Sequence, residues 1–162
     1  MCIRDRYSME EGLGDSSELV PMLDDAIAGD PQNIELWFSR AQIFVSLEDY
    51  DEAIASLEKA IELNPQSYEA QFFTGYYIIM KADALNQEAN EKEYTNEGEY
   101  EADQKEILSI YSQAVPYLEV AHEIMPQNPD PVQLLKTLCY RLRDEPGMME
   151  KYEKYNELYK QM

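Results

Sequence analysis

The sequence has 162 residues, 44% of them apolar, and its 33 acidic side chains against 13 Lys plus Arg give a net charge of −20. This length and apolar content suit one packed domain and argue against a disordered chain. A surface this negative repels phosphate groups, so nucleic acids and anionic membranes are poor partners. It suits either simple solubility or a basic partner. No run reaches the about 18 apolar residues that a membrane-spanning helix needs.

The first predicted helix covers residues 15–30. Leu19, Leu23 and Ala26 recur in it at three- and four-residue steps and therefore share one face. Pro31 marks its end, because proline lacks the N–H that a helix interior requires. The apolar stripe can cover one side of the next helices, but no earlier helix is predicted to cover its other side.

Residues 33–65 predict a helical hairpin with a polar break at 48–49 and a stop at Pro65. Each of its two helices carries an apolar face in which small side chains stand where two helix axes would approach most closely. The face residues are Trp37, Ala41, Phe44, Ala53, Leu57 and Ala60.

This order of side-chain sizes resembles the tetratricopeptide repeat, a pair of helices of about 34 residues with an early aromatic residue, small contact residues and a final proline. Arg40 departs from the pattern, since the family usually has leucine there. The resemblance implies an all-α solenoid of antiparallel helix pairs, in which each repeat contacts only its neighbours.

The pattern recurs along the chain at related spacings. Leu57 follows Leu23 by 34 residues, which is one repeat period, and Leu118 follows Leu57 by 61 residues, which is one period plus 27. Each of these leucines precedes a proline by eight residues. We therefore expect a truncated repeat of which 15–30 is the second helix, a complete repeat at 31–65, a lengthened repeat at 66–126, and a C-terminal repeat and cap at 127–162.

The lengthened repeat predicts two long antiparallel helices. The first begins near Ser67, the second returns from about Tyr100, and a polar tip at 90–99 contains Gly98 as the breaker. For the last helix of the chain, we expect one face turned toward the stack. Its residues are Met149, Tyr152, Asn156 and Tyr159.

A lengthened repeat followed by a short one resembles a group of bacterial tetratricopeptide proteins, many of them exported. Residues 1–6 read MCIRDR and resemble a translated sequencing adapter, so we expect 1–14 to be a disordered or artefactual lead-in. Its composition is not that of a signal peptide.

Signals for chemistry are almost absent. The single histidine, His122, is expected to be an exposed helical residue, because a metal site would need further His or Cys ligands at helical spacing. Cys139 is expected to be buried. Neither a phosphate-binding loop nor a nucleophile elbow is present. We expect no catalytic residue, no cofactor and no metal.

The resemblance does imply a candidate site, the concave groove that the first helices of the pairs line. Carried over position by position, the groove residues are Phe38, Gln42, Phe72, Phe73, Tyr76, Met80, Thr137 and Arg141. The group from 72 to 80 is either a binding surface or core, since a long helix also needs an apolar face for its partner. The Lys, Asn and Arg set with which one branch of the family clamps C-terminal carboxylates is absent.

We therefore hypothesise a non-catalytic protein-interaction scaffold that binds a peptide or a helix, basic or apolar, in this groove. The alternative is a structural module of a larger, N-terminally truncated protein, in which the lengthened hairpin mediates self-association.

Overall fold

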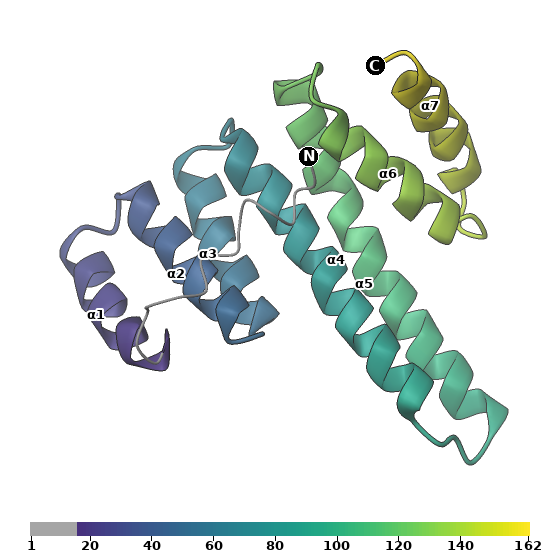
Figure 1. Cartoon of the computed structure of the whole chain (residues 1–162), viewed down its shortest axis with the longest axis horizontal. Coiled ribbons are helices and arrows are strands. Elements are labelled where there is room, and N and C mark those ends of the chain that lie inside the picture. Colours follow the sequence, from purple (N-terminus) through teal and green to yellow (C-terminus); the bar gives the residue numbers. More distant parts are fainter. Residues whose placement is uncertain (1–15) are drawn as a thin grey trace.

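The computed structural model describes residues 16–162, so the lead-in expected at 1–14 lies outside the described residues. Within this range the chain forms seven α-helices and no strand, which confirms the predicted all-α class (Figure 1). The helices are α1 (Ser16–Gly29), α2 (Ile34–Ser46), α3 (Tyr50–Leu63), α4 (Tyr68–Glu91), α5 (Glu97–Ile124), α6 (Pro129–Arg141) and α7 (Met148–Lys160).

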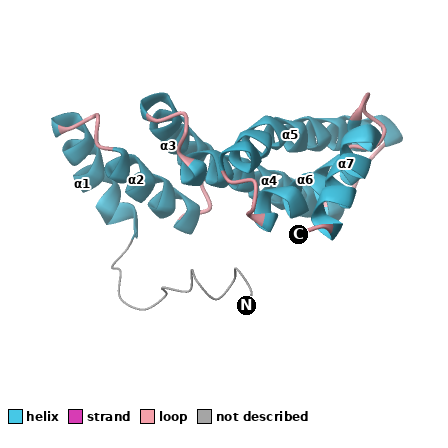
Figure 2. Ribbon diagram, turned by 90° about the horizontal axis from the view of Figure 1, so that it is seen from above, coloured by secondary structure: helices cyan, strands magenta, loops and turns pink. Residues whose placement is uncertain are grey.

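Each helix packs mainly on the helices next to it in sequence. The largest contacts are those of α2 with α3, α4 with α5 and α6 with α7, and smaller contacts join α1 to α2, α3 to α4 and α5 to α6. Figure 2 shows these pairs following one another along one direction. The fold is a helical-repeat solenoid, whose stability is approximately a sum of contacts between neighbours.

Side-chain caps set the starts of five helices. In each case a side-chain oxygen accepts a hydrogen bond from a backbone N–H two or three residues later, which satisfies one otherwise unpaired donor. The capping residues are Asn33, Asp49, Ser67, Asn96 and Asn128. Helix α7 instead follows Gly147, whose φ of 79° lies in the left-handed region that glycine adopts without strain.

The first hairpin is packed as its sequence predicts. Ala41, Ala53 and Ala60 are at most 1% exposed, so the small residues do lie between the helices. Trp37 is half-buried, and its indole N–H donates to the backbone carbonyl of Pro31 at 3.0 Å. That bond ties α2 to the turn that precedes it.

The second hairpin is much longer than the first and extends beyond the rest of the stack (Figure 1). Helix α4 has 24 residues and α5 has 28, which confirms the two lengthened helices. At Gly75 the helices are so close that an added Cβ would lie 2.8 Å from Cγ of Leu118. Only glycine leaves this contact undisturbed.

Gly98 is not the breaker at the hairpin tip, because it lies inside the first turn of α5. Asn96 accepts a hydrogen bond from the backbone N–H of Glu99 at 3.1 Å, and the Glu99 carboxylate accepts one from the Thr95 hydroxyl at 2.9 Å. This reciprocal cap starts the helix before the glycine, and its hydrogen bonds outweigh the low helix propensity of Gly98.

The face predicted for α7 is only partly right, because Tyr152 packs against the core but the most buried residue lies outside the predicted set. Tyr155 is the buried residue at 2% exposure, whereas Met149 and Tyr159 are 41% and 36% exposed. The Tyr155 hydroxyl donates to Glu119 of α5 at 2.8 Å. Tyrosines occur on two overlapping stripes of this helix, and the half-buried carboxylate of Glu119 on α5 selects the stripe that faces inward. Its other members, packed against the core, are Met148, Tyr152 and Leu158.

Candidate functional site

Five aromatic rings follow one another along the first half of α4, and we call them the α4 ring cluster: Tyr68, Phe72, Phe73, Tyr76 and Tyr77. Tyr68, Phe72 and Tyr76 are spaced by one helical turn and stack with centroid separations of 5.6 and 6.2 Å. Phe73 and Tyr77 form a parallel pair at 5.8 Å. The helix therefore carries a continuous aromatic surface.

The structure divides the predicted groove residues of α4. Phe72 is only 7% exposed and belongs to the core cluster, so it supports the others from beneath. Phe73, Tyr76 and Met80 are half-buried. Burial raises the pKa of Tyr50, at the start of α3, and the charge of Glu48 raises it further.

The other predicted residues lie on the first helices of the neighbouring pairs. On α2, Phe38 is half-buried and Gln42 is exposed. On α6, Thr137 is exposed, and its hydroxyl donates to the carbonyl of Gln133 at 3.0 Å. Arg141 pairs with Asp83 of α4 at 2.9 Å, so it contacts the same helix as the ring cluster. Phe38 and Gln42 are one repeat away from the rings.

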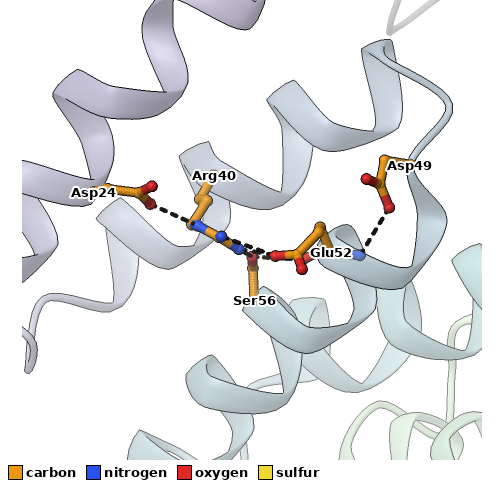
Figure 3. Close-up of polar contacts among 5 residues, drawn as sticks. All are labelled: Asp24, Arg40, Asp49, Glu52 and Ser56. Carbon is orange, nitrogen blue, oxygen red and sulfur yellow. Dashed lines mark hydrogen bonds and ion pairs between the residues drawn. The ribbon is translucent and has the colours of Figure 1, made fainter.

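Arg40, noted in the sequence only as a departure from the repeat pattern, joins three helices (Figure 3). Its guanidinium donates to Asp24 of α1 and to Glu52 of α3, both at 2.9 Å, and to the hydroxyl of Ser56 at 2.7 Å. Burial lowers the pKa of Arg40, but the hydrogen bonds and charges of the two carboxylates outweigh it, and the net pKa is raised.

Two carboxylates join the helices of the C-terminal half. Asp83 of α4 accepts from the hydroxyl of Tyr111 and from Arg141. Glu119 of α5 accepts from Lys151 and from Tyr155, both at 2.8 Å. Burial, followed by the hydrogen bond to the carboxylate, raises the pKa of each tyrosine. These contacts fix the rotation of α5, α6 and α7 and create no reactive group.

His122 is half-buried rather than exposed. Its ring meets Tyr155 edge-on, and its Nδ1 is a buried atom with no hydrogen-bond partner among the described residues. Cys139 is buried as predicted, and burial raises the pKa of its thiol to about 11. Across residues 16–162, no three His, Cys, Asp or Glu side chains are grouped to hold a metal ion.

Two hollows lie outside the predicted groove residues. One, of about 320 Å³, lies between α3, α4 and α5, with Ile54, Ile78 and Ile110 among its lining residues. The other, of about 350 Å³, lies between α1 and α2. In the described part of the chain, each helix is either too short or too polar to cross a lipid bilayer.

Comparison with known proteins agrees with this architecture. Residues 34–67 match the family model of the tetratricopeptide repeat. Among curated proteins, tetratricopeptide repeat protein 28 of Homo sapiens is 35% identical over 75 residues, which cover 44% of this chain and 3% of that protein. The chain thus spans only a small part of that relative.

Among solved structures, one described as MamA MSR-1 C2 has a TM-score of 0.58 at 18% identity, covering 91% of this chain and 70% of that one. PilW, described as a widely conserved type IV pilus biogenesis factor, has a TM-score of 0.40 at 21% identity, with coverages of 91% and 70%. The first match shows a shared fold, and the second is too distant to carry an argument.

The repeat match, the shared fold and the contacts between successive helix pairs agree with one another. Residues 34–67 therefore match a tetratricopeptide repeat, and the chain as a whole shares the all-α helical-repeat fold of the MamA structure.

Proposed function

We propose that the chain binds a peptide or a helix on the face formed by the first helices of its pairs, α2, α4 and α6. Phe73, Tyr76 and Met80 act as the anchors. The observation that carries the proposal is the α4 ring cluster, because four of its five rings remain half-buried in a chain whose core is otherwise well covered. Aromatic side chains of this kind dominate the energy of protein interfaces.

The cluster is also held in place before any partner binds. Phe72 is buried beneath the other rings, and Tyr68 accepts a hydrogen bond from Asn128 at 2.8 Å, which ties the start of α4 to the start of α6. Rings already held in one conformation lose little entropy on binding, so more of their contact energy becomes affinity.

The charge distribution indicates the partner. Residues 129–162 contain six acidic and six basic side chains, so the net charge of −20 belongs to residues 1–128. Helix α2 itself carries one acid, Glu35, and one base, Arg40, and residues 68–80 of α4 carry one acid, Glu69, so most of this negative charge surrounds the face instead of lying on it. An apolar helix flanked by Lys or Arg matches this surface, because opposite charges increase the rate of encounter and select the correct partner.

A displayed library of short peptides provides the test. The best binder is measured by calorimetry against the chain and against the double variant Phe73→Ser/Tyr76→Ser. We expect a loss of affinity of about tenfold or more, because two anchors are removed. The matched control is Tyr100→Ser at the distant hairpin tip, where the side chain is 45% exposed. Equal affinity of the folded double variant and the unchanged chain would refute the proposal.

The length of the second hairpin favours a second candidate, self-association through its distal half. This part projects beyond the other helices and exposes Tyr100. Light scattering on a variant lacking residues 90–99 separates the two candidates. A loss of oligomers together with unchanged peptide binding would support self-association as a separate property.

A further inference from the structure

The hollow of about 320 Å³ between α3, α4 and α5 is lined by three isoleucines, one from each helix: Ile54, Ile78 and Ile110. Ile78 is 4% exposed and belongs to the core, whereas Ile54 and Ile110 are half-buried. The apolar surface therefore continues from the core to the opening of the hollow. Its volume lies at the lower end of the roughly 300–1,000 Å³ of ligand sites, which suits one long side chain better than a larger ligand.

The hollow opens on a different side of α4 from the ring cluster. Ile78 follows Tyr76 by two residues, which is about 200° around a helix of about 3.6 residues per turn. The lining residues that the structure describes come from α3, α4 and α5, and α3 and α5 are the second helices of their pairs. The hollow is therefore a separate surface, and a ligand held there does not depend on peptide binding at the α4 ring cluster.

One end of the hollow is electrically neutral. There the ammonium of Lys81 lies 2.5 Å from the carboxylate of Asp51, so an ion pair joins α4 to α3. The charge of Lys81 is already matched by this partner. A second cation at this end would be repelled by Lys81.

The other end carries a negative charge. Glu58 accepts a hydrogen bond from the hydroxyl of Tyr117 at 2.9 Å, and that phenol is neutral because burial, followed by this bond, raises the pKa of Tyr117 to about 12. The adjacent base, Lys59, is paired with Glu62 at 2.8 Å. Among the described residues, no Lys or Arg therefore pairs with Glu58. Gln113 of α5, exposed at the same hollow, adds an amide oxygen that can accept a hydrogen bond.

The two helices that flank the hollow are strongly acidic. Helices α3 and α5 carry eleven acidic side chains against two basic ones, whereas α2, α4 and α6 together carry six against four. The field around the opening therefore attracts cations and repels anions, which raises the local concentration of a basic ligand.

We infer that this hollow binds a basic peptide segment by taking up one arginine side chain, with the aliphatic stem on the three isoleucines and the guanidinium at Glu58. Arginine buries its methylene stem along apolar surface while its charged end stays at the edge. The planar array of N–H donors on the guanidinium matches a carboxylate and can also reach the amide oxygen of Gln113.

Other side chains satisfy only part of the site. A purely aliphatic side chain would cover the isoleucines, but it would displace water from the Glu58 carboxylate without replacing the lost hydrogen bonds, which costs free energy. An acidic side chain would be repelled by Glu58 and by the charge of α3 and α5. A side chain with an apolar stem and a cationic end is therefore the one that matches both the wall and the charge.

The test is a titration of the full chain, labelled with ¹³C at the isoleucine δ1 methyl groups, with the end-blocked peptide Gly-Ser-Arg-Ser-Gly at physiological ionic strength. Ile54, Ile78 and Ile110 report on the hollow, and Ile34 and Ile43 of α2 serve as internal controls. We expect saturable shifts at the first three methyl groups only. Replacing the arginine by citrulline, which has a similar shape and no charge, should weaken binding about fivefold or more.

Two glutamates of α3 give a matched pair of variants. Glu58→Gln removes the charge at the hollow and keeps an oxygen that accepts hydrogen bonds, and it should weaken binding of the arginine peptide about fivefold. Glu62→Gln removes the same charge from a side chain that is 64% exposed, pairs with Lys59 and lies outside the lining, so the affinity should change less than about twofold. The double variant Phe73→Ser/Tyr76→Ser should bind the arginine peptide as the unchanged chain does.

Four results would overturn the inference. The first is the lack of a saturable shift at the three methyl groups of the hollow with millimolar peptide. The second is equal weakening by Glu58→Gln and Glu62→Gln, which would show attraction by the overall charge alone. The third is a norleucine peptide that binds as tightly as the arginine peptide, because the hollow would then select an apolar side chain. The fourth is loss of binding in Phe73→Ser/Tyr76→Ser, which would place the arginine at the ring cluster.

Discussion

The first and second hairpins place different side chains at one equivalent position of the repeat. In α2 this position holds Arg40, which reaches out to Asp24 of α1 and to Glu52 and Ser56 of α3. In α4, one period later, it holds Thr74, which is 0% exposed and donates to the carbonyl of Ala70 in its own helix at 2.7 Å. In α2 the side chain at this position therefore bonds to two neighbouring helices, whereas in α4 its hydrogen bond stays within its own helix.

The neighbouring helices explain the difference. Beside Arg40, α3 offers a carboxylate and a hydroxyl. The counterpart of Ser56 in the second hairpin is Tyr117, whose hydroxyl instead donates to Glu58 of α3 at 2.9 Å. A polar group between packed helices is tolerated where its donors find acceptors. The repeat therefore determines that this position lies between packed helices. The side chains on the neighbouring helices determine whether a polar residue there can form hydrogen bonds across the interface.

The next position along shows the same contrast in size. Ala41 is the contact residue of the first hairpin and Gly75 that of the second, where Leu118 leaves no room for a Cβ. At these two positions the second hairpin is thus the more tightly packed, and the first is the more polar. The following predictions test this distinction, beginning with the largest expected effect.

Gly75→Leu should be the most damaging substitution. The new side chain would be forced into Leu118, which is 0% exposed, and we expect a loss of about 3 kcal/mol in the free energy of unfolding, at the upper end for overpacking. Urea denaturation measures it. The control is Gly29→Leu, because an added Cβ there has no atom within 4 Å. Equal loss in both variants would contradict the close approach at Gly75.

Arg40→Ala should cost about 2 kcal/mol, since a side chain only 16% exposed loses two ion pairs at once. Arg40→Leu should recover at least half of this loss, because leucine refills the apolar space and the two carboxylates, each about half exposed, can be hydrated. Thermal unfolding of both variants decides the point. A leucine variant as unstable as the alanine variant would show that the charge, and not the packing, is essential.

Thr74→Val should cost about 1 kcal/mol or less, because the hydroxyl serves only a carbonyl that already has a partner within its own helix. Comparison of its denaturation midpoint with that of Arg40→Ala tests the distinction directly. If Thr74→Val proved the more destabilising of the two, Thr74 would have to join helices in a way that its hydrogen bond does not indicate.

The smallest effect concerns alkaline pH. Burial, followed by the hydrogen bond to Glu58, raises the pKa of Tyr117 from 10.0 to about 12. A raised pKa in the folded state gives a contribution to stability that is complete below pH 10 and is lost as the pH rises through 12. The free energy of unfolding should therefore fall across this range, and less steeply in Tyr117→Phe. Equal slopes would show that Tyr117 titrates normally in the folded chain.

The extent of each helix was predictable because it depends on adjacent residues. Asn33, Asp49 and Ser67 cap helices through bonds that span two or three residues, and Pro65 stops one through its own ring. The sequence also revealed the period of the repeat and the small residues between the helices. Where two local signals competed, as at Gly98 beside the Asn96 cap, the glycine alone was misleading.

The rotation of each helix about its axis was decided only in the tertiary structure. Tyr155 became the inward residue of α7 through a bond to Glu119, 36 residues away, and Arg141 met Asp83 across 58 residues. The separation of buried Phe72 from half-buried Phe73 also depends on neighbouring helices. The periodicity of a sequence limits which side chains can share a face, whereas contacts with partners distant in sequence select the face that is buried.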